Sequence, residues 1–157
     1  MKVKHPTIIL GIGNEILMDD GIGPKLIDMI QEQNPQKNVD YKKVFLGGLD
    51  ILDLIRDYQK VIFIDAIKTR NGIPGTVYYF THEDFMETHH LSNFHDSSFL
   101  NTIKLGKKLG LSLPDEIHII AIEIVNDMFF GKSFSPEITK EIDTISQKVN
   151  QLINDIL

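Results

Sequence analysis

The chain has 157 residues, of which 42% are hydrophobic and 24% are charged. This length and composition predict one globular domain, residues 1–157, with a substantial core. Because 22 acidic and 16 basic side chains give a net charge of −6, nucleic acid is excluded as an expected partner. No apolar run approaches the roughly 20 residues that cross a bilayer, so no membrane span is predicted. The absence of cysteine excludes thiolate metal sites and is typical of a cytoplasmic protein.

The first predicted elements alternate between strand and helix. Thr7–Ile12 is a continuous apolar run, which is typical of a strand buried on both faces. A helix is predicted for Gly21–Gln33 and a second strand for Asp40–Leu46, with Gly47-Gly48 marking its end. Leu49–Tyr58 carries apolar residues on one helical side and is predicted to be a short helix.

The middle of the chain contains the clearest strand pattern. Lys60–Ala66 is apolar throughout its centre and carries Asp65 near its carboxyl end. Thr76–Phe80 is β-branched and aromatic, which predicts a fourth strand. Thr81–Asn93 is polar without a clear period, so we expect an irregular loop that includes a helical turn at Glu83–Glu87.

The last third of the chain completes the alternation. Asp96–Gly110 is predicted to be a helix, and Glu116–Val125 is predicted to be the fifth strand. After the loop Asn126–Ser135, a long helix is predicted for Pro136–Ile156, with proline in its first turn. Strands that alternate with helices predict a mostly parallel sheet covered on both faces, a three-layer α/β/α sandwich.

Three acidic or imidazole features follow predicted strands or precede a helix. Asp19-Asp20 lies in the loop after the first strand, Asp65 ends the third strand, and His95 stands ahead of the helix that begins near Asp96. Ligands of open α/β sheets bind beyond the carboxyl ends of the strands. Two carboxylates and one imidazole suit a borderline divalent metal such as nickel or zinc. Only one of the two adjacent aspartates is expected to point inward, and the other to cap the helix starting at Gly21.

Four stretches combine glycines, acids and a histidine in a distinctive order: Gly11-Ile12-Gly13-Asn14 with Met18–Gly23, Gly47-Gly48, Ile64–Ala66 with Pro74–Thr76, and Ser92–His95. In order and spacing, the chain resembles the hydrogenase maturation endopeptidases. These enzymes trim the C-terminal tail of the nickel–iron hydrogenase large subunit after nickel has been inserted. One departure is Leu46, because the family usually has an acid before its glycine pair.

The resemblance carries further expectations about fold, site and partner. It implies a twisted five-stranded sheet with one antiparallel strand, for which Thr76–Phe80 is the candidate. It implies that Asp20, Asp65 and His95 are both the nickel-contacting and the catalytic residues. The nickel would be carried by the large-subunit precursor rather than held permanently, without an organic cofactor, and the enzyme would act as a cytoplasmic monomer.

Other functions remain open at this point. A nickel-binding maturation chaperone without peptidase activity, or a generic metal hydrolase, would use the same residues. A phosphoacceptor receiver domain also has an acidic pair and an aspartate ending strand three, but it needs a lysine where Glu123–Asn126 stands. A dinucleotide site is excluded, because Gly11-Ile12-Gly13 lacks the third glycine of the fingerprint, which would fall at Ile16.

Overall fold

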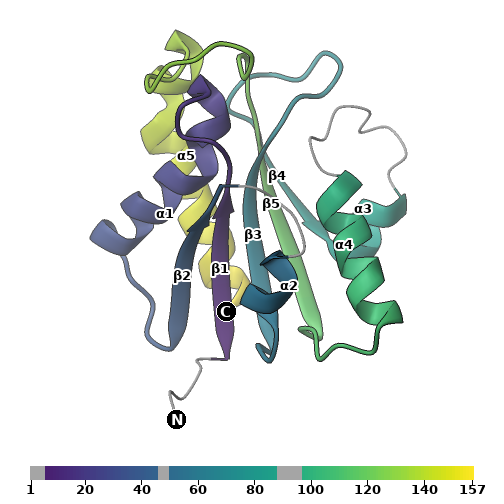
Figure 1. Cartoon of the computed structure of the whole chain (residues 1–157). Coiled ribbons are helices and arrows are strands. Elements are labelled where there is room, and N and C mark those ends of the chain that lie inside the picture. The colour runs from purple at the N-terminus through teal and green to yellow at the C-terminus, as the bar shows by residue number, and fades with distance from the viewer. Residues whose placement is uncertain (1–5, 46–49, 88–96) are drawn as a thin grey trace.

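The apolar stretches predicted as strands form a single twisted sheet in the computed structural model, which describes residues 6–45, 50–87 and 97–157 (Figure 1). Within these residues the sheet has five strands in the order β2-β1-β3-β5-β4. Their bounds are Thr7–Ile12 (β1), Val39–Val44 (β2), Lys60–Ile67 (β3), Val77–Thr81 (β4) and Glu116–Glu123 (β5). Neighbouring strands are parallel except β4, which runs antiparallel to β5. The predicted fold, including the reversed strand, is confirmed.

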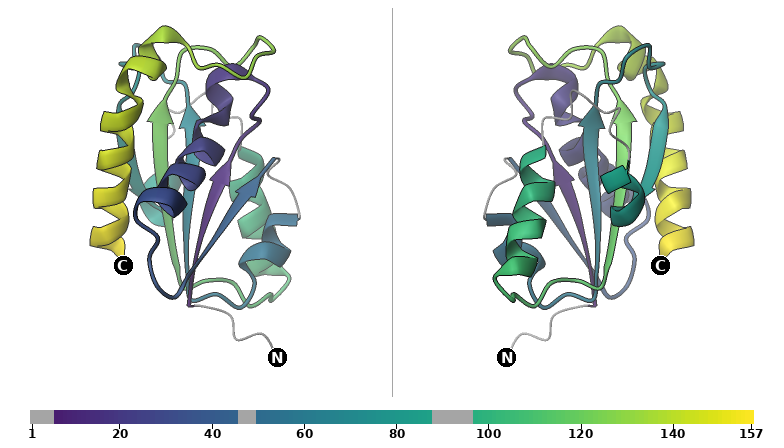
Figure 2. Two further views of the ribbon diagram at one scale, coloured as in Figure 1. Left: turned by 90° about the vertical axis from the view of Figure 1, so that its left-hand side faces the viewer. Right: turned by 90° about the vertical axis from the view of Figure 1, so that its right-hand side faces the viewer.

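Helices cover both faces of the sheet (Figure 2). The apolar sides of α1 (Ile22–Gln33) and α5 (Pro136–Ile156) pack on one face, and those of α2 (Asp50–Ile55) and α4 (Ser97–Lys108) pack on the other. Two separate apolar cores result, one on each side of the sheet, and β1 and β3 contribute alternate side chains to both. In the described ranges no helix is both long and apolar enough to cross a membrane.

Several predicted boundaries differ from the structure. The helix predicted to reach Tyr58 ends at Ile55, and the stretch predicted as an irregular loop contains the helix α3, His82–Glu87. The fifth strand ends at Glu123 rather than Val125. The Ile124 amide still donates to the Ile67 carbonyl, but the two amides after it, those of Val125 and Asn126, donate to the carboxylate of Asp19 instead of to a neighbouring strand.

Helix α1 lies against the carboxyl ends of two strands at Gly23. A Cβ atom placed on Gly23 would lie 2.5 Å from the carbonyl oxygen of Ile12 and 2.6 Å from that of Ile64. Both neighbours are backbone atoms of the central strands, which cannot move aside without disturbing the sheet. The missing side chain therefore allows the start of α1 to approach the edge where the first and third strands end.

We predict that Gly23→Ala lowers the free energy of unfolding by about 1–3 kcal/mol, because the added methyl group overpacks this contact. Urea denaturation measures the change. Gly106→Ala is the matched control in α4, where a Cβ would meet only the side-chain ends of Leu52 and Leu113. Alanine also has the higher helix propensity there, so the control should lose less. Equal stability of the wild type and Gly23→Ala would contradict this account of the contact.

Candidate functional site

The loops that leave the carboxyl ends of β1, β3 and β5 gather at one end of the molecule, the upper end in Figure 1. The loop after β1 contains a short 3-10 helix, η1, at Met18–Gly21, which includes both Asp19 and Asp20. Element η1 contacts β3, which carries Asp65 near its end. The structure therefore brings the acidic pair and Asp65 to the same edge of the sheet.

Asp65 is buried in the middle of the sheet's carboxyl edge. Its strand lies between β1 and β5, and Asp65 pairs in register with Ala121. Only 4% of the residue is exposed, and its Oδ1 accepts a hydrogen bond of 2.8 Å from the amide of Ala66. A carboxylate at the end of a strand that is otherwise apolar costs solvation energy, so its position calls for polar or ionic partners at this edge.

Asp20 lies on the solvent side of the same edge and is half-buried. Its Oδ2 accepts a hydrogen bond of 2.9 Å from the amide of Asn14. The turn after β1 is tight, because Gly13 has a φ of +150° and a Cβ there would lie 1.9 Å from the carbonyl oxygen of Asp20. This glycine allows the chain to fold back and hold Asp20 beside the strand end.

A pocket of about 230 Å³ adjoins this turn. It is lined by Gly13, Asn14, Ile16 and residues at the end of β2, including Lys43 and Phe45. The Lys43 ammonium lies 3.2 Å from Asp28 and 3.6 Å from the exposed Glu15, and the hydrogen bond to Asp28 raises the pKa of Lys43. The pocket is open space beside Asn14, whose amide binds Asp20, and the lysine on its wall is paired with two acids.

His95, the third predicted ligand, lies outside the described residues, as do Leu46 and the glycine pair Gly47-Gly48. Among the described residues no group of three histidine, cysteine, aspartate or glutamate side chains is placed to hold a metal ion. The two acids at the edge thus supply an oxygen pair, and oxygen donors together with one imidazole would suit nickel. The complete three-residue site stays a prediction.

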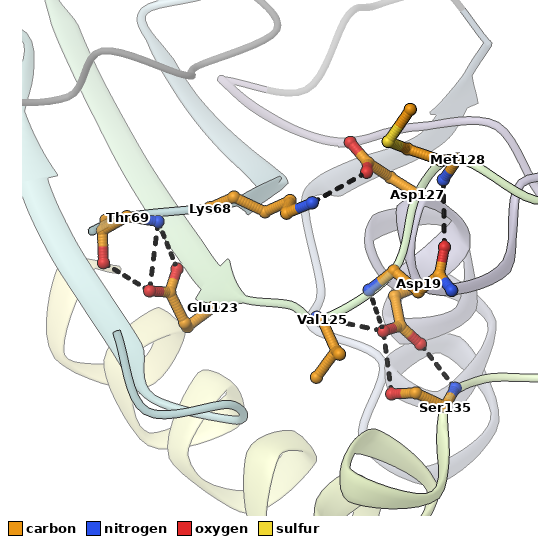
Figure 3. A network of polar contacts seen from close by, with 9 residues as sticks. Asp19, Lys68, Thr69, Glu123, Val125, Asp127, Met128 and Ser135 are labelled. Carbon is orange, nitrogen blue, oxygen red and sulfur yellow. Dashed lines mark hydrogen bonds and ion pairs between the residues drawn. The ribbon is translucent and has the colours of Figure 1, made fainter. Parts of the chain in front are cut away.

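Asp19 has a different role from its neighbour (Figure 3). It is fully buried, and its carboxylate accepts four hydrogen bonds: from the amides of Val125 (3.1 Å), Asn126 (2.9 Å) and Ser135 (2.7 Å), and from the Ser135 hydroxyl (2.8 Å). The expectation that one of the two aspartates caps the helix after Gly21 is wrong, since α1 has no side-chain cap. Asp19 instead fixes the loop between β5 and α5 to the loop that carries Asp20.

The loop after β3 is held by a second buried acid, Glu123 at the end of β5 (Figure 3). Its carboxylate accepts hydrogen bonds from the amide and the hydroxyl of Thr69. Nearby, Lys68 forms an ion pair of 3.2 Å with Asp127. The three loops at this edge are therefore joined by polar contacts, which hold the surroundings of the candidate site in place.

A second polar pocket, of about 250 Å³, lies at the amino end of β5 and contains His82, Lys107, Glu116 and His118. Burial lowers the pKa of His82, and the neighbouring Lys107 lowers it further. His118 is already engaged by Glu116 at 3.3 Å and by the Tyr79 hydroxyl at 2.8 Å. Because this pocket is at the opposite end of β5 from Asp65 and Asp20, it is separate from the candidate site.

An α/β/α sandwich with two carboxylates at the carboxyl edge of its sheet is an architecture suited to a hydrolase that acts near a metal. The family model described as hydrogenase maturation protease matches residues 24–152. The chain is 26% identical over 151 residues to the hydrogenase expression/formation protein HupD of Rhodobacter capsulatus, covering 93% of this chain and 70% of that protein.

Solved structures agree with this match. The hydrogenase maturating endopeptidase HybD from E. coli shares the fold with a TM-score of 0.78 at 16% identity, covering 95% of this chain and 92% of that one. The [NiFe] hydrogenase maturation protease HybD from Thermococcus kodakarensis gives a TM-score of 0.68 at 25% identity, covering 93% and 97%. The chain belongs to the hydrogenase maturation protease family and is thus a peptidase, which decides against the receiver-domain alternative.

Proposed function

We propose that this peptidase removes the C-terminal extension of a nickel–iron hydrogenase large-subunit precursor that already carries nickel. The reaction would take place in the cytoplasm, which agrees with a chain that contains no cysteine. The observation that carries the proposal is the placement of Asp20, on η1, and Asp65, on β3, at one edge of a family-typical fold. Nickel is part of the substrate in this proposal, and the enzyme's residues recognise it.

The proposed site is an incomplete ligand set formed by Asp20, Asp65 and His95. Three ligands leave coordination positions for the substrate and for water. A metal held there can position the scissile peptide, polarise its carbonyl or lower the pKa of a bound water. One of the two carboxylates takes a proton from the attacking water, whose oxygen bonds to the carbonyl carbon while the carbon–nitrogen bond breaks and the leaving amine gains a proton.

The different environments of Asp65 and Asp20 support different roles for the two acids in the proposed site. Asp65 is buried and bonded to its neighbouring amide, so its position is fixed by the sheet. Asp20 lies on a short helix and is only half-buried, so part of it is open to a substrate. A fixed carboxylate and an accessible one at the same edge suit a site that has to receive a metal from outside.

The proposal predicts that cleavage depends on the nickel in the precursor. Purified enzyme should cut nickel-loaded precursor at least about a hundredfold faster than nickel-free precursor, the size of one typical catalytic contribution. The measurement is the rate at which the shortened large subunit appears on a gel or by mass spectrometry. Adding nickel to the enzyme alone, with nickel-free precursor, is the control and should not restore cleavage.

Two outcomes would contradict the proposal in different ways. Equal cleavage of nickel-free and nickel-loaded precursor would show that metal recognition does not gate the reaction. Binding of nickel-loaded precursor without any cleavage would instead favour the chaperone alternative.

A further inference from the structure

The loop between β5 and α5 exposes three consecutive large apolar side chains. Met128 is 80% exposed, Phe129 66% and Phe130 83%. Three adjacent residues of this size in water are costly for a folded protein unless another molecule covers them at times. We call Met128–Phe130 together with the 45%-exposed Ile16 the rim patch.

The rim patch is held between fixed points on both sides. Before it, the Asp19 amide donates a hydrogen bond to the Asn126 carbonyl oxygen (3.0 Å), and the Asn126 amide donates one to the Asp19 carboxylate (2.9 Å). After it, Gly131 exchanges backbone hydrogen bonds with the β1–α1 loop: the Met18 amide donates to the Gly131 carbonyl (2.9 Å), and the Gly131 amide donates to the Ile16 carbonyl (2.8 Å).

The segment between these anchors is also tied down. Asp127 forms the ion pair with Lys68, and the Met128 amide donates to the Asn126 side chain at 3.1 Å (Figure 3). Because its backbone is fixed on both sides, the exposure of the three side chains is a built feature of the loop rather than the result of a missing contact.

The rim patch adjoins the candidate site. Ile16 lines the pocket next to Asp20, and Phe45, which is also exposed, lines the pocket's other side. The anchor Asp19 is the residue immediately before Asp20 on η1. Ile16 links the rim patch to this pocket, because it lines the pocket and its carbonyl oxygen accepts the amide of Gly131, the residue after Phe130.

The size of the patch favours a transient partner over a second copy of the chain. Its exposed side chains amount to roughly 400–700 Å², taking about 150–250 Å² for a large apolar side chain. A stable dimer buries about 800 Å² on each partner. Phenylalanine and methionine, in contrast, are enriched at the centres of protein interfaces. A protein substrate that must dock and then leave fits this area better than a permanent subunit does.

We infer that the rim patch is the docking surface for an apolar face on the folded body of the precursor next to its cleavage point. This inference rests on the proposed function and adds a binding surface to it. By docking there, the precursor's body would hold the tail over the pocket and Asp20. The patch itself takes no part in proton transfer and contributes to binding, so its loss should raise KM while kcat is kept.

The test uses Phe129→Ser/Phe130→Ser and Met128→Ser in the full chain, with nickel-loaded precursor. We expect the double variant to lose about tenfold or more in kcat/KM through KM, with kcat changed less than twofold, and Met128→Ser to lose less. Leu109→Ser is the matched control: Leu109 is 64% exposed after α4, at the other end of the sheet, and should leave KM unchanged. The midpoint of thermal unfolding should stay the same in all variants.

Binding of the precursor and the oligomeric state of the free enzyme separate the remaining outcomes. A normal KM and normal precursor binding in the double variant, while the wild type cleaves, would overturn the rim patch and leave the proposed function intact. Binding through the patch without cleavage by the wild type would support the patch and contradict the peptidase mechanism. A dimer of the free wild type that the double variant abolishes would assign the patch to self-association and overturn the inference.

Discussion

Replacing Asp20 or Asp65 by asparagine, or His95 by alanine, is expected to lower the rate of precursor cleavage at least about a hundredfold. Asparagine keeps the size of aspartate but removes the negative charge that would bind a cation and accept a proton. The two acids lie at one edge of the sheet, on η1 and on β3, so each change weakens the same proposed centre. The measurement is the initial rate of tail removal from nickel-loaded precursor.

Glu15→Gln is the matched control for these variants. Glu15 belongs to the same loop as Asp20, but its side chain is 57% exposed and pairs only loosely with Lys43, at 3.6 Å. Its loss should leave the rate within about twofold, because exposed ion pairs contribute little. Wild-type cleavage by all three site variants would remove Asp20, Asp65 and His95 from the mechanism.

Replacing Asp19 by alanine is expected to lower the free energy of unfolding by about 3–5 kcal/mol, because hydrogen bonds to a charged group are strong and each buried donor left without an acceptor costs about 1–3 kcal/mol. The change would leave the buried amide and hydroxyl of Ser135 and the partly buried amides of Val125 and Asn126 without their acceptor. It would also release the loop between β5 and α5 from η1. Urea denaturation followed by circular dichroism measures the loss.

Two further variants keep this prediction testable if Asp19→Ala does not fold. Ser135→Ala removes only the hydroxyl bond to Asp19 and should cost about 1 kcal/mol. Asp20→Asn, one residue away, should change the free energy of unfolding by less than about 1 kcal/mol while it lowers the cleavage rate at least about a hundredfold. Of the two adjacent aspartates, Asp19 would thus be needed for stability and Asp20 for activity. An Asp19→Ala protein as stable as the wild type would refute the structural role of Asp19.

The fold was predictable because its signals are local. Each of three elements can be recognised from a few consecutive residues: the apolar run of β1, the apolar strand β3 with Asp65 near its end, and the proline at the start of α5. The antiparallel placement of β4 followed from the family resemblance. The placement of Asp20 and Asp65 at one edge was also predictable, since strand ends in an open sheet gather there, and their role stays a prediction.

The role of Asp19 could not be read from the sequence, because its partner Ser135 is 116 residues away. A carboxylate next to a helix start has local uses that look equally suitable, such as capping, and only tertiary structure decides between them. The early end of β5 has the same cause, since Asp19 accepts the amides of Val125 and Asn126, which therefore do not pair with a neighbouring strand. The rim patch was equally hidden, because three apolar residues in a loop show their exposure only once the loop is placed.

The most direct test of the central claim is a crystal of the protein grown with nickel and measured at the nickel absorption edge. We predict an anomalous peak in contact with a carboxylate oxygen of Asp20, one of Asp65 and the imidazole of His95, at the roughly 2.0–2.2 Å typical of such ligands. A peak held by other residues, or coordinates that place His95 away from the edge shared by Asp20 and Asp65, would contradict it.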